Sequence, residues 1–501
     1  MRWVDNMADM IRRNMRSFLR ITPPQVSSFQ ITEQLDYYAN AALCRIWERG
    51  DADELSQIYK ELPGDTNRIR FWAAVPTTGN DINKLHTGIP GIMVRILTDV
   101  TVADMNAVEV SSPEKQKLWD SIAKDNDFED LVEDAVKNVL VVGDGAFKIS
   151  IDPAITEYPI IEFVPGDQLE YVYNRGRVCE IVFRTEYTAQ SGKYILEERY
   201  GRGYIRSKLK KDDREVPLDT IPETSGLSEE VTFDGSFMMA QQFMAFKSNK
   251  YKGRGSSIFD RKADSFDSLD EAWSQWMDAL RRGRSKEYIP EKMLPRNPNT
   301  GEILPPNAFD HAYIKLESSM QEGASNTIEV KQPVIPHESY LSTYITALDL
   351  CLQGILSPST LGIDVKKLDN AEAQREKEKV TLYSRNKIVN AIQKTIPKLV
   401  DTVLKVYSTS MKQTLTDVEA TINFGEYANP SFESQVETIG KGKTQGIMST
   451  EACVEELYGD SKDDEWKEEE VRRLKEEQGI ASEEEPAVNL DAGDYKIDFE
   501  G

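Results

Sequence analysis

The sequence SIFDRKADSFDSLDEAWSQWMDALRRG, residues 257–283, has the spacing of a helix with one buried face. Ser257 with Asp260 is placed to cap the start of this helix, and Gly283 is placed to end it. At 1.5 Å per residue, the helix forms a rod roughly 40 Å long. Its apolar positions recur every three or four residues: Phe259, Ala263, Phe266, Leu269, Trp273, Trp276 or Met277, and Leu280.

A second, shorter rod is predicted at residues 338–356 from the same kind of apolar spacing. Between the two rods, residues 287–331 contain three short β-rich runs, near 288–289, 312–316 and 327–330. An insert of about 45 residues is too small to build its own core. We therefore expect neighbouring elements, or other copies of the insert, to stabilise it.

A loop after the second rod leads into one very long helix. The loop opens with Ser-Pro-Ser-Thr at residues 357–360, and the helix runs from about Asn370 to Tyr407. Its later turns bury an apolar face, and Pro397 should kink it. The order of helix, β insert, returning helix, loop and long helix has few uses, so it is more informative than any catalytic motif in the chain.

Two features of the first rod concern its partners. Trp273 and Trp276 lie three residues apart, and we expect them to face different ways, each packed within a subunit or between copies. The basic residues near the end of the rod have two interpretations: they complement the negative end of the helix dipole, or they form a rim facing phosphate or a partner. This group comprises Arg281, Arg282, Arg284, Lys286 and Arg296.

Composition limits the function classes. The chain has 501 residues, which predicts two to four substructures. Its net charge of -24 argues against an autonomous nucleic-acid binder, because bound phosphates must be neutralised by lysine and arginine. The same charge is compatible with a surface that DNA slides past. No apolar stretch reaches the length of a membrane span, so we expect a soluble, cytosolic protein.

The part before the first rod combines helices with an antiparallel meander. Helical spacing dominates residues 31–140, with the clearest helix running from Pro113 to Leu140. Period-two patterns occupy residues 146–210, with hairpin turns at Asn-Arg-Gly and Gln-Ser-Gly. Residues 1–20 carry five arginines and an apolar face at helical spacing; they form a docked first helix or an amphipathic arm that binds a partner.

The end of the chain is helical and acidic. A strand is predicted at residues 418–424, followed by helices at 451–458 and 462–478, the second capped by Ser461 with Asp464. From residue 460 to 501, 16 acidic side chains stand against 6 basic ones, a net of -10. Residues 481–501 should be disordered.

The sequence offers little for catalysis. The four cysteines (Cys44, Cys179, Cys351, Cys453) have no paired spacing and are expected to be reduced core thiols. None of the three histidines has a plausible partner nearby in sequence. Gly442-Lys443-Thr444 ends like a phosphate-binding loop but lacks the required earlier glycine, so we reject it. Carboxylates are abundant enough that a two-metal nuclease stays open as a minor alternative.

With this order of elements, the chain resembles a portal protein of a tailed bacteriophage, of the siphophage type. The resemblance covers roughly residues 30 to 480 and depends on four motifs taken together. They are Val142-Gly143-Asp144-Gly145-Ala146-Phe147-Lys148, Tyr251-Lys252-Gly253-Arg254-Gly255-Ser256, Ser357-Pro358-Ser359-Thr360-Leu361-Gly362, and Gly446-Ile447-Met448-Ser449-Thr450-Glu451.

The resemblance implies an α+β, mainly helical portal fold. Its parts would be a wing of N-terminal helices and β meander (1–250), a first stem helix (251–284), a clip (285–333), a second stem helix (334–356), a tunnel loop (357–370), a long kinked helix with a return strand of the wing (371–429), crown helices (430–480), and a disordered acidic tail (481–501). The tunnel-loop residues that would face DNA are Ser359, Thr360, Ile363, Asp364, Val365, Lys366 and Lys367. The basic group named above would form the rim between clip and stem.

The resemblance also implies a function and partners. The protein would form a homo-oligomeric ring, expected to be a dodecamer, at one capsid vertex of the virion, after assembly in the host cytoplasm. Double-stranded DNA would pass through it during packaging and ejection. The packaging ATPase (the terminase large subunit) and a head-completion adaptor would dock on it, beside the major capsid and scaffold proteins, with no membrane. We expect no catalytic residue, metal or cofactor. Another structural virion component, such as a minor head protein, is the main alternative, and a metal-dependent DNA-processing enzyme is a lesser one.

Overall fold

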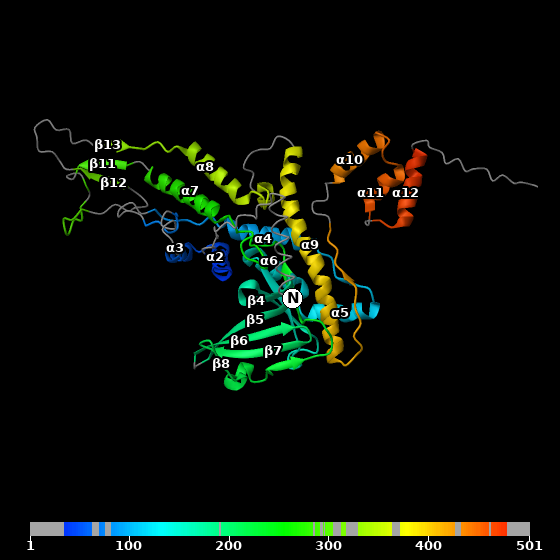
Figure 1. Ribbon diagram of the computed structural model, residues 1–501. Helices are drawn as coiled ribbons and strands as arrows, with labels where there is room; N and C mark the ends of the chain where they lie inside the picture. The colour runs from blue at the N-terminus through cyan, green and yellow to red at the C-terminus, as the bar shows by residue number, and fades with distance from the viewer. Residues whose placement is uncertain are drawn as a thin grey trace, which may run out of the picture. The chain divides into compact units, whose positions relative to one another are not determined.

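The computed structural model describes residues 35–62, 70–75, 82–189, 192–283, 286–290, 294, 296–303, 312–316, 329–362, 371–425, 432–459 and 462–477. The chain divides into two compact units, Met1–Gly425 and Glu426–Gly501. The first unit combines helices with mainly antiparallel sheets (Figure 1), which confirms the expected α+β class. Among the described residues, no helix has both the length and the apolar character that crossing a membrane requires.

The first unit begins with three helices, α2 (Tyr37–Arg49), α3 (Ala52–Glu61) and α4 (Ile89–Val102). Asp36 caps α2, since its carboxylate accepts a hydrogen bond from the Ala39 N–H at 2.8 Å. Gly50 ends α2 in the left-handed conformation, at a φ of 74°, and Asp51 then caps α3. These caps allow α3 to follow α2 with only two residues between them.

The helix predicted from Pro113 to Leu140 is two helices, α5 (Pro113–Asp125) and α6 (Phe128–Val142). Pro113 does occupy the first turn, as predicted. The break comes at Asn126, whose side-chain amide donates to the carbonyl oxygens of Ile122 and Pro159 and accepts from the Ile161 N–H. The apolar spacing continues across the break, which is why the sequence pattern concealed it. Helix α6 buries its apolar face in the main core (Val132, Ala135, Val136, Val139, Leu140).

The predicted single meander is two sheets. The first has the order β10-β2-β3, from β2 (Asp144–Ser150), β3 (Ile160–Pro165) and β10 (Ala240–Met244), all antiparallel. Phe147 of β2 is fully buried, with its ring centre 5.1 Å from that of Phe163 and 5.8 Å from that of Phe243. A short 3-10 turn, η2 (Gly166–Gln168), then carries the chain out of this sheet.

The second sheet follows the chain in the order β4-β5-β6-β7-β8, with β9 also paired to β7. The hairpin predicted at residues 174–176 is confirmed, because Arg175 and Gly176 both have positive φ, 49° and 77°. Two short 3-10 turns, η3 (Leu218–Thr220) and η4 (Pro222–Thr224), connect β8 to β9. The strands are β4 (Leu169–Asn174), β5 (Arg177–Ala189), β6 (Gly192–Gly201), β7 (Tyr204–Lys211), β8 (Arg214–Val216) and β9 (Glu230–Thr232).

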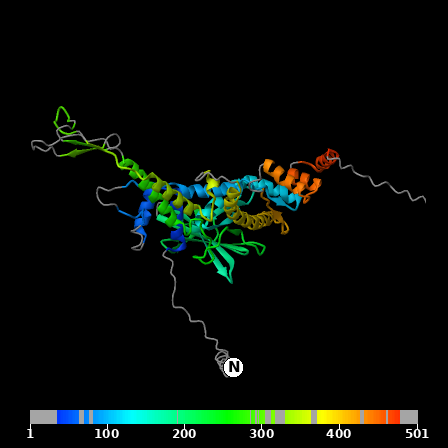
Figure 2. The same cartoon turned by 90° about the horizontal axis from the view of Figure 1, so that it is seen from above.

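The two rods are α7 (Ala263–Arg282) and α8 (His337–Leu352), which lie side by side with a small sheet at their far end (Figures 1 and 2). The start predicted at Ser257 was wrong. The Ser257 hydroxyl accepts from the Phe259 N–H within a turn, and Arg261 has a φ of 68°, so the helix begins only after it. With 20 residues, α7 spans about 30 Å.

The insert between the rods contains the three predicted strands. They are β11 (Lys286–Pro290), β12 (Ala312–Leu316) and β13 (Glu329–Lys331). Strand β11 is central, with β12 parallel and β13 antiparallel to it.

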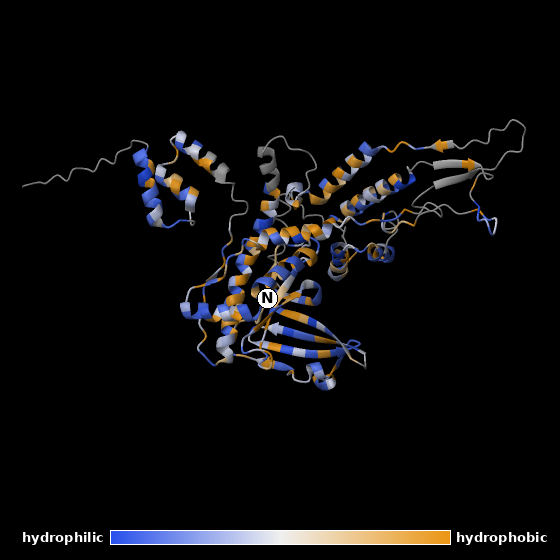
Figure 3. Ribbon diagram, turned by 180° about the vertical axis from the view of Figure 1, so that it is seen from behind, coloured by the Kyte–Doolittle hydropathy of each residue, from blue (hydrophilic) through white to orange (hydrophobic). Residues whose placement is uncertain are grey.

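The long helix is α9 (Ala371–Ser410), entered through the 3-10 turn η6 (Pro358–Leu361) and residues that lie outside the described part. Its predicted apolar face is buried from Ile388 to Val403, together with the very apolar α4, which is largely orange in Figure 3. Pro397 lies inside the helix; the kink stays a prediction. The strand predicted at residues 418–424 is reduced to β14 (Ala420–Thr421), paired with β1 (Glu109–Val110).

The second unit consists of α10 (Phe432–Thr444), α11 (Thr450–Tyr458) and α12 (Asp464–Glu477). Helix α10 was not predicted, and the rejected phosphate-loop resemblance falls at its end. Asp463, whose carboxylate accepts from the Trp466 N–H at 3.0 Å, caps α12, so the cap predicted at Ser461 with Asp464 was wrong. The acidic tail, 481–501, lies outside the described residues.

Candidate functional site

The candidate site is the α7/α8 pair with its two ends: the basic rim near the insert, and the loop that joins α8 to α9. Trp276 and Tyr340 mark the register of the pair, because their rings stack with centres 6.4 Å apart and an interplanar angle of 7°. Farther along, Trp273 lies 5.5 Å from Tyr344. The two helices are therefore antiparallel neighbours along their length.

The expectation that Trp273 and Trp276 face different ways was wrong. Their ring centres lie 5.9 Å apart, edge to face, and both rings contact Tyr344 of α8. Residues three apart are neighbours on a helix surface, so both indoles reach the same side. Aromatic packing thus holds the middle of the rod pair together.

The base of the rod pair is fastened by Lys262, the residue before α7. Its ammonium group donates to the carbonyl oxygens of Leu350, at 2.7 Å, and Gln353, at 2.8 Å. Carbonyl groups at the C-terminal end of a helix lack intrahelical partners and lie at the negative end of the helix dipole. A lysine there donates hydrogen bonds to these carbonyl groups, and its positive charge is attracted to the dipole. Partial burial lowers the pKa of Lys262. At the other end, Gly283 makes room for the side chain of Ile335.

The predicted basic rim is only partly described. Arg281 and Arg282 are exposed at the last turn of α7, and Arg282 pairs with Asp278 at 2.7 Å. Lys286 opens β11, opposite Lys331 of β13. Arg296 lies in a hairpin of the insert, where its guanidinium donates to the Gly301 carbonyl oxygen at 3.2 Å. Arg284 is outside the described residues.

The predicted tunnel loop is also divided. Its beginning is anchored on α9: the Thr381 hydroxyl lies 3.0 Å from the Thr360 hydroxyl and accepts from the Ser357 N–H at 2.9 Å. The Ser357 and Ser359 hydroxyls lie 2.7 Å apart. A cavity of about 390 Å³ adjoins this anchor, lined by the end of α8, by Ser357 and by Val380. The other predicted residues, Ile363, Asp364, Val365, Lys366 and Lys367, lie outside the described residues.

Buried acids on α7, which sequence reasoning missed, connect the rod to residues 70–75 and 82–88. Asp270 accepts hydrogen bonds from the Thr87 N–H at 2.9 Å and from the Trp72 indole at 3.3 Å. It also accepts from the Thr87 hydroxyl at 2.9 Å and contacts His86 Nδ1 at 2.7 Å, with the side chains of Asp270 and His86 1% and 4% exposed. The Ser274 hydroxyl accepts from the Leu85 N–H. The rod is therefore attached through hydrogen bonds that have a defined geometry.

Asp267 extends this attachment. Its carboxylate accepts from the Phe71 N–H at 3.1 Å and the Trp72 N–H at 3.3 Å. Burial raises the pKa of Asp267, and these hydrogen bonds oppose the rise. A sequence signal existed, since Asp267, Asp270 and Ser274 recur at helical spacing beside the apolar stripe, but charged residues at such positions usually face solvent.

The two glycine-containing motifs before the rod lie against each other. Gly255 N–H donates to the Asp144 carboxylate, and Arg254 pairs with the same carboxylate at 3.0 Å. The Arg254 guanidinium also lies 3.7 Å from the ring centre of Tyr37, whose hydroxyl donates to Asp144 at 3.1 Å. Burial raises the pKa of Asp144, and the neighbouring charge of Arg254 opposes the rise. These residues form a buried joint, which we call the Asp144 joint.

The cysteines behave as expected of reduced thiols. Cys44, Cys351 and Cys453 are buried, Cys179 is half-buried, and none is in a disulfide. Burial raises the pKa of the Cys44 and Cys351 thiols to about 12, so neither is a reactive thiolate. Among the residues that the structure describes, no cluster of three or more histidine, cysteine, aspartate or glutamate side chains is arranged to hold a metal ion.

No family model matches the chain, and no curated protein matches it. Solved structures match weakly. A chain of the "Virion of native gene transfer agent (GTA) particle" is 13% identical with a TM-score of 0.36, over 72% of this chain and 87% of that chain. A chain of the "Neck of native GTA particle computed with C12 symmetry" is 13% identical with a TM-score of 0.36, over 74% of this chain and 89% of that chain. A chain of the "Neck of empty GTA particle computed with C6 symmetry" is 11% identical with a TM-score of 0.37, over 72% of this chain and 87% of that chain. Likeness at these TM-scores carries no argument about fold or function.

Proposed function

We propose that this protein is a portal: a structural ring at one capsid vertex, through which double-stranded DNA is packaged and ejected. The observation that carries the proposal is the α7/α8 pair, two antiparallel helices that carry a three-stranded sheet at their far end. In a ring, the tilted helix pairs of neighbouring copies form the wall of a channel. In this proposal the protein itself catalyses no reaction.

Exposed leucines on the helix pair support association with other copies. Leu280 of α7 is 43% exposed, and Leu341 and Leu350 of α8 are 45% and 49% exposed. Scattered leucines on a surface are normal, but here they lie on both members of one projecting pair. A neighbouring pair packed against them would remove these side chains from water, and head-to-tail packing of this kind closes a ring.

The insert supports the same arrangement. Its strands have 5, 5 and 3 residues, and Val330 in β13 is 61% exposed. A three-stranded sheet of this size is marginal alone, so packing against the next copy would stabilise it. We place the packaging ATPase, and later a head-completion adaptor, at the basic rim of this insert.

The net charge favours a channel that lets DNA pass over one that binds DNA tightly. A protein with a net charge of -24 repels DNA phosphates over most of its surface. Ring symmetry multiplies every contact, so even weak lysine contacts would add up to strong retention. We place residues 363–367 in the channel, where Asp364 and the nearby Asp369 balance the charges of Lys366 and Lys367. The anchor at Thr381 would hold this loop at its base.

Two experiments test the proposal. The first measures the mass of the purified protein in solution: a portal assembles to a multiple of 56.8 kDa, whereas monomers at all concentrations overturn the proposal. A matched pair sharpens it, since Leu341→Arg should abolish assembly and Leu227→Arg, at a leucine of similar exposure away from the rods, should not.

The second experiment deletes residues 363–367. The rings should stay intact, and DNA packaging or retention should fall. Loss of the rings would show that this segment is a structural strut.

A further inference from the structure

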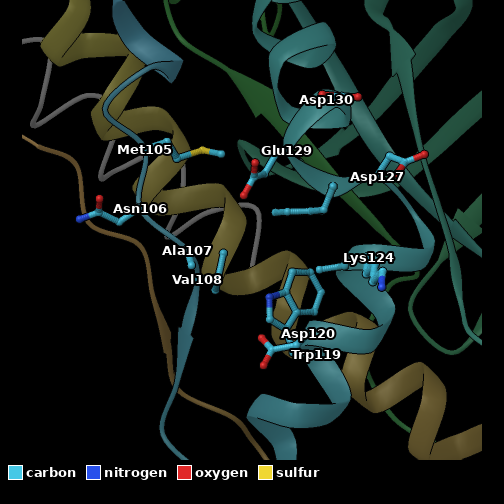
Figure 4. Close-up of a pocket in the computed structure, with 12 residues that line it drawn as sticks. Met105, Asn106, Ala107, Val108, Trp119, Asp120, Lys124, Asp127, Glu129 and Asp130 are labelled. Atoms are coloured by element: carbon cyan, nitrogen blue, oxygen red, sulfur yellow. The ribbon is translucent and has the colours of Figure 1, made fainter.

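A pocket outside the candidate site lies between the end of α5, the start of α6 and residues 105–108 (Figure 4). Its volume is about 390 Å³. Trp119 and Phe128 form an apolar wall, both buried, with ring centres 4.9 Å apart at 82°. Met105 and Val108 line the opposite side. The pocket is therefore lined by apolar side chains but open to solvent.

The rim of this pocket is acidic. Four carboxylates line it, all exposed, against a single lysine, Lys124. Within the described part of the chain none of the four forms an ion pair; Asp120 accepts only from the Gln116 amide, at 2.7 Å. Acidic residues in the first turn of α6 complement the helix dipole, but Asp120 lies in the middle of α5, where that explanation does not apply. The carboxylates are Asp120, Asp127, Glu129 and Asp130.

One segment of this chain has the complementary chemistry. Residues 1–20 carry five arginines against two aspartates, with a net charge of +3 in a chain whose total is -24. Their apolar residues, three of them methionines among the five, recur at helical spacing. Methionine fills irregular apolar gaps well. These positions are Met7, Met10, Ile11, Met15 and Phe18.

The segment is long enough to reach the pocket. The described chain starts at Leu35, whose carbonyl oxygen accepts from the Tyr251 hydroxyl at 3.0 Å. Close by, Tyr37 donates to the Val142 carbonyl oxygen at the last turn of α6, at 3.1 Å. The pocket lies at the other end of α6, about 22 Å away for a 15-residue helix. Residues 21–34, when extended, span up to roughly 45 Å.

We propose that residues 1–20 of this chain dock in the pocket. Their apolar face packs on the accessible apolar lining of the pocket, made by Met105, Ala107 and Ala123, and their arginines pair with the four rim carboxylates. The proposal is independent of the portal function, because it depends only on the pocket beside α5 and α6 and on the composition of residues 1–20.

The test uses the full-length protein with a benzoylphenylalanine photo-crosslinker in place of Met15. Peptide mapping by mass spectrometry should find the crosslinks on residues 105–108 and 119–130. The variant Arg12→Glu, Arg13→Glu, Arg16→Glu should lower the crosslink yield roughly fivefold, the effect of losing a few surface ion pairs. Adding Asp120→Arg and Glu129→Arg to that variant should restore the yield.

A matched control reverses three exposed lysines elsewhere, Lys247→Glu, Lys250→Glu and Lys252→Glu, which changes the net charge by the same amount and should leave the yield unchanged. Crosslinks on the pocket of the same chain or of another copy both support docking, and isotopic mixing distinguishes them. Three results would each overturn the proposal: crosslinks spread over other surfaces, crosslinks on co-purified DNA, or a crosslink yield that the arginine substitutions do not change.

Discussion

Gly143 and Gly255 lie backbone against backbone: a β-carbon on Gly143 would come 2.7 Å from the Gly255 carbonyl oxygen. Gly143 also ends α6 with a φ of 110°, which side-chain-bearing residues rarely adopt. The close approach brings the Gly255 N–H to the Asp144 carboxylate. It joins the segment that precedes the first rod to the strand that opens the first sheet.

Replacing Gly255 by alanine should destabilise the protein strongly. The added methyl group would collide with the Gly143 backbone. The two backbones cannot separate without breaking the hydrogen bond from the Gly255 N–H to the Asp144 carboxylate, so we expect a loss of about 3 kcal/mol or more. Gly226→Ala is the matched control, because nothing lies within 4 Å of a β-carbon there. Urea unfolding followed by tryptophan fluorescence measures both. Equal effects of the two substitutions would contradict the close approach.

Arg254→Met should be costly because it leaves Asp144 as an unpaired buried charge. Removing one partner of a buried pair typically costs about 3–5 kcal/mol. The corresponding change in an exposed pair, Arg206→Met opposite Glu230 at 2.9 Å, should cost about 1 kcal/mol or less. Thermal unfolding of the two variants gives the comparison. A small effect at Arg254 would mean that the hydrogen bonds from the Gly255 N–H and the Tyr37 hydroxyl are enough to stabilise Asp144.

Trp276 and Tyr340 should couple energetically across the rod pair. Their stacked rings predict an interaction of about 0.5–1.5 kcal/mol beyond the area they bury. A double-mutant cycle with Trp276→Leu and Tyr340→Leu measures it, using the unfolding free energies of the four proteins. Additive effects of the two substitutions would show that the helices do not meet at this register.

The unfolding free energy of the protein should depend on pH through the buried carboxylate of Asp267. The pKa of Asp267 in the fold lies above its ordinary value of 3.8, so the fold favours the protonated form. As pH rises from 3.8 through the raised pKa, the native protein should therefore lose stability relative to Asp267→Asn, which does not ionise. The difference in unfolding free energy between the two proteins, measured against pH, should change in that direction. A difference that is flat, or that grows in favour of aspartate, would contradict the burial of this carboxylate.

Periodicity predicted the elements of this protein well. The rods, the three strands of the insert and the long helix all follow from spacing that is local in sequence. Errors came where the backbone becomes left-handed at one residue: Arg261, at a φ of 68°, delays the start of α7, and Asp127, at a φ of 45°, divides the helix from Pro113. The apolar stripe continues past both points, so only the backbone conformation reveals the interruption.

The joints could not be predicted, because their partners are far apart in sequence. Asp144 and Arg254 are 110 positions apart, and His86 and Asp270 are 184 apart. The motif glycines indicated that backbones approach closely, but not which backbones meet. The tunnel-loop residues from Ile363 to Lys367 and the rim residue Arg284 stay predictions.

Electron microscopy of the assembled protein, at a resolution that traces helices, shows whether α7 and α8 line a channel. A portal forms closed rings with a central channel about as wide as a DNA duplex, lined by α7 and α8 of every copy. Particles without a channel, or rings in which α7 and α8 lie on the outer surface, would contradict the portal proposal.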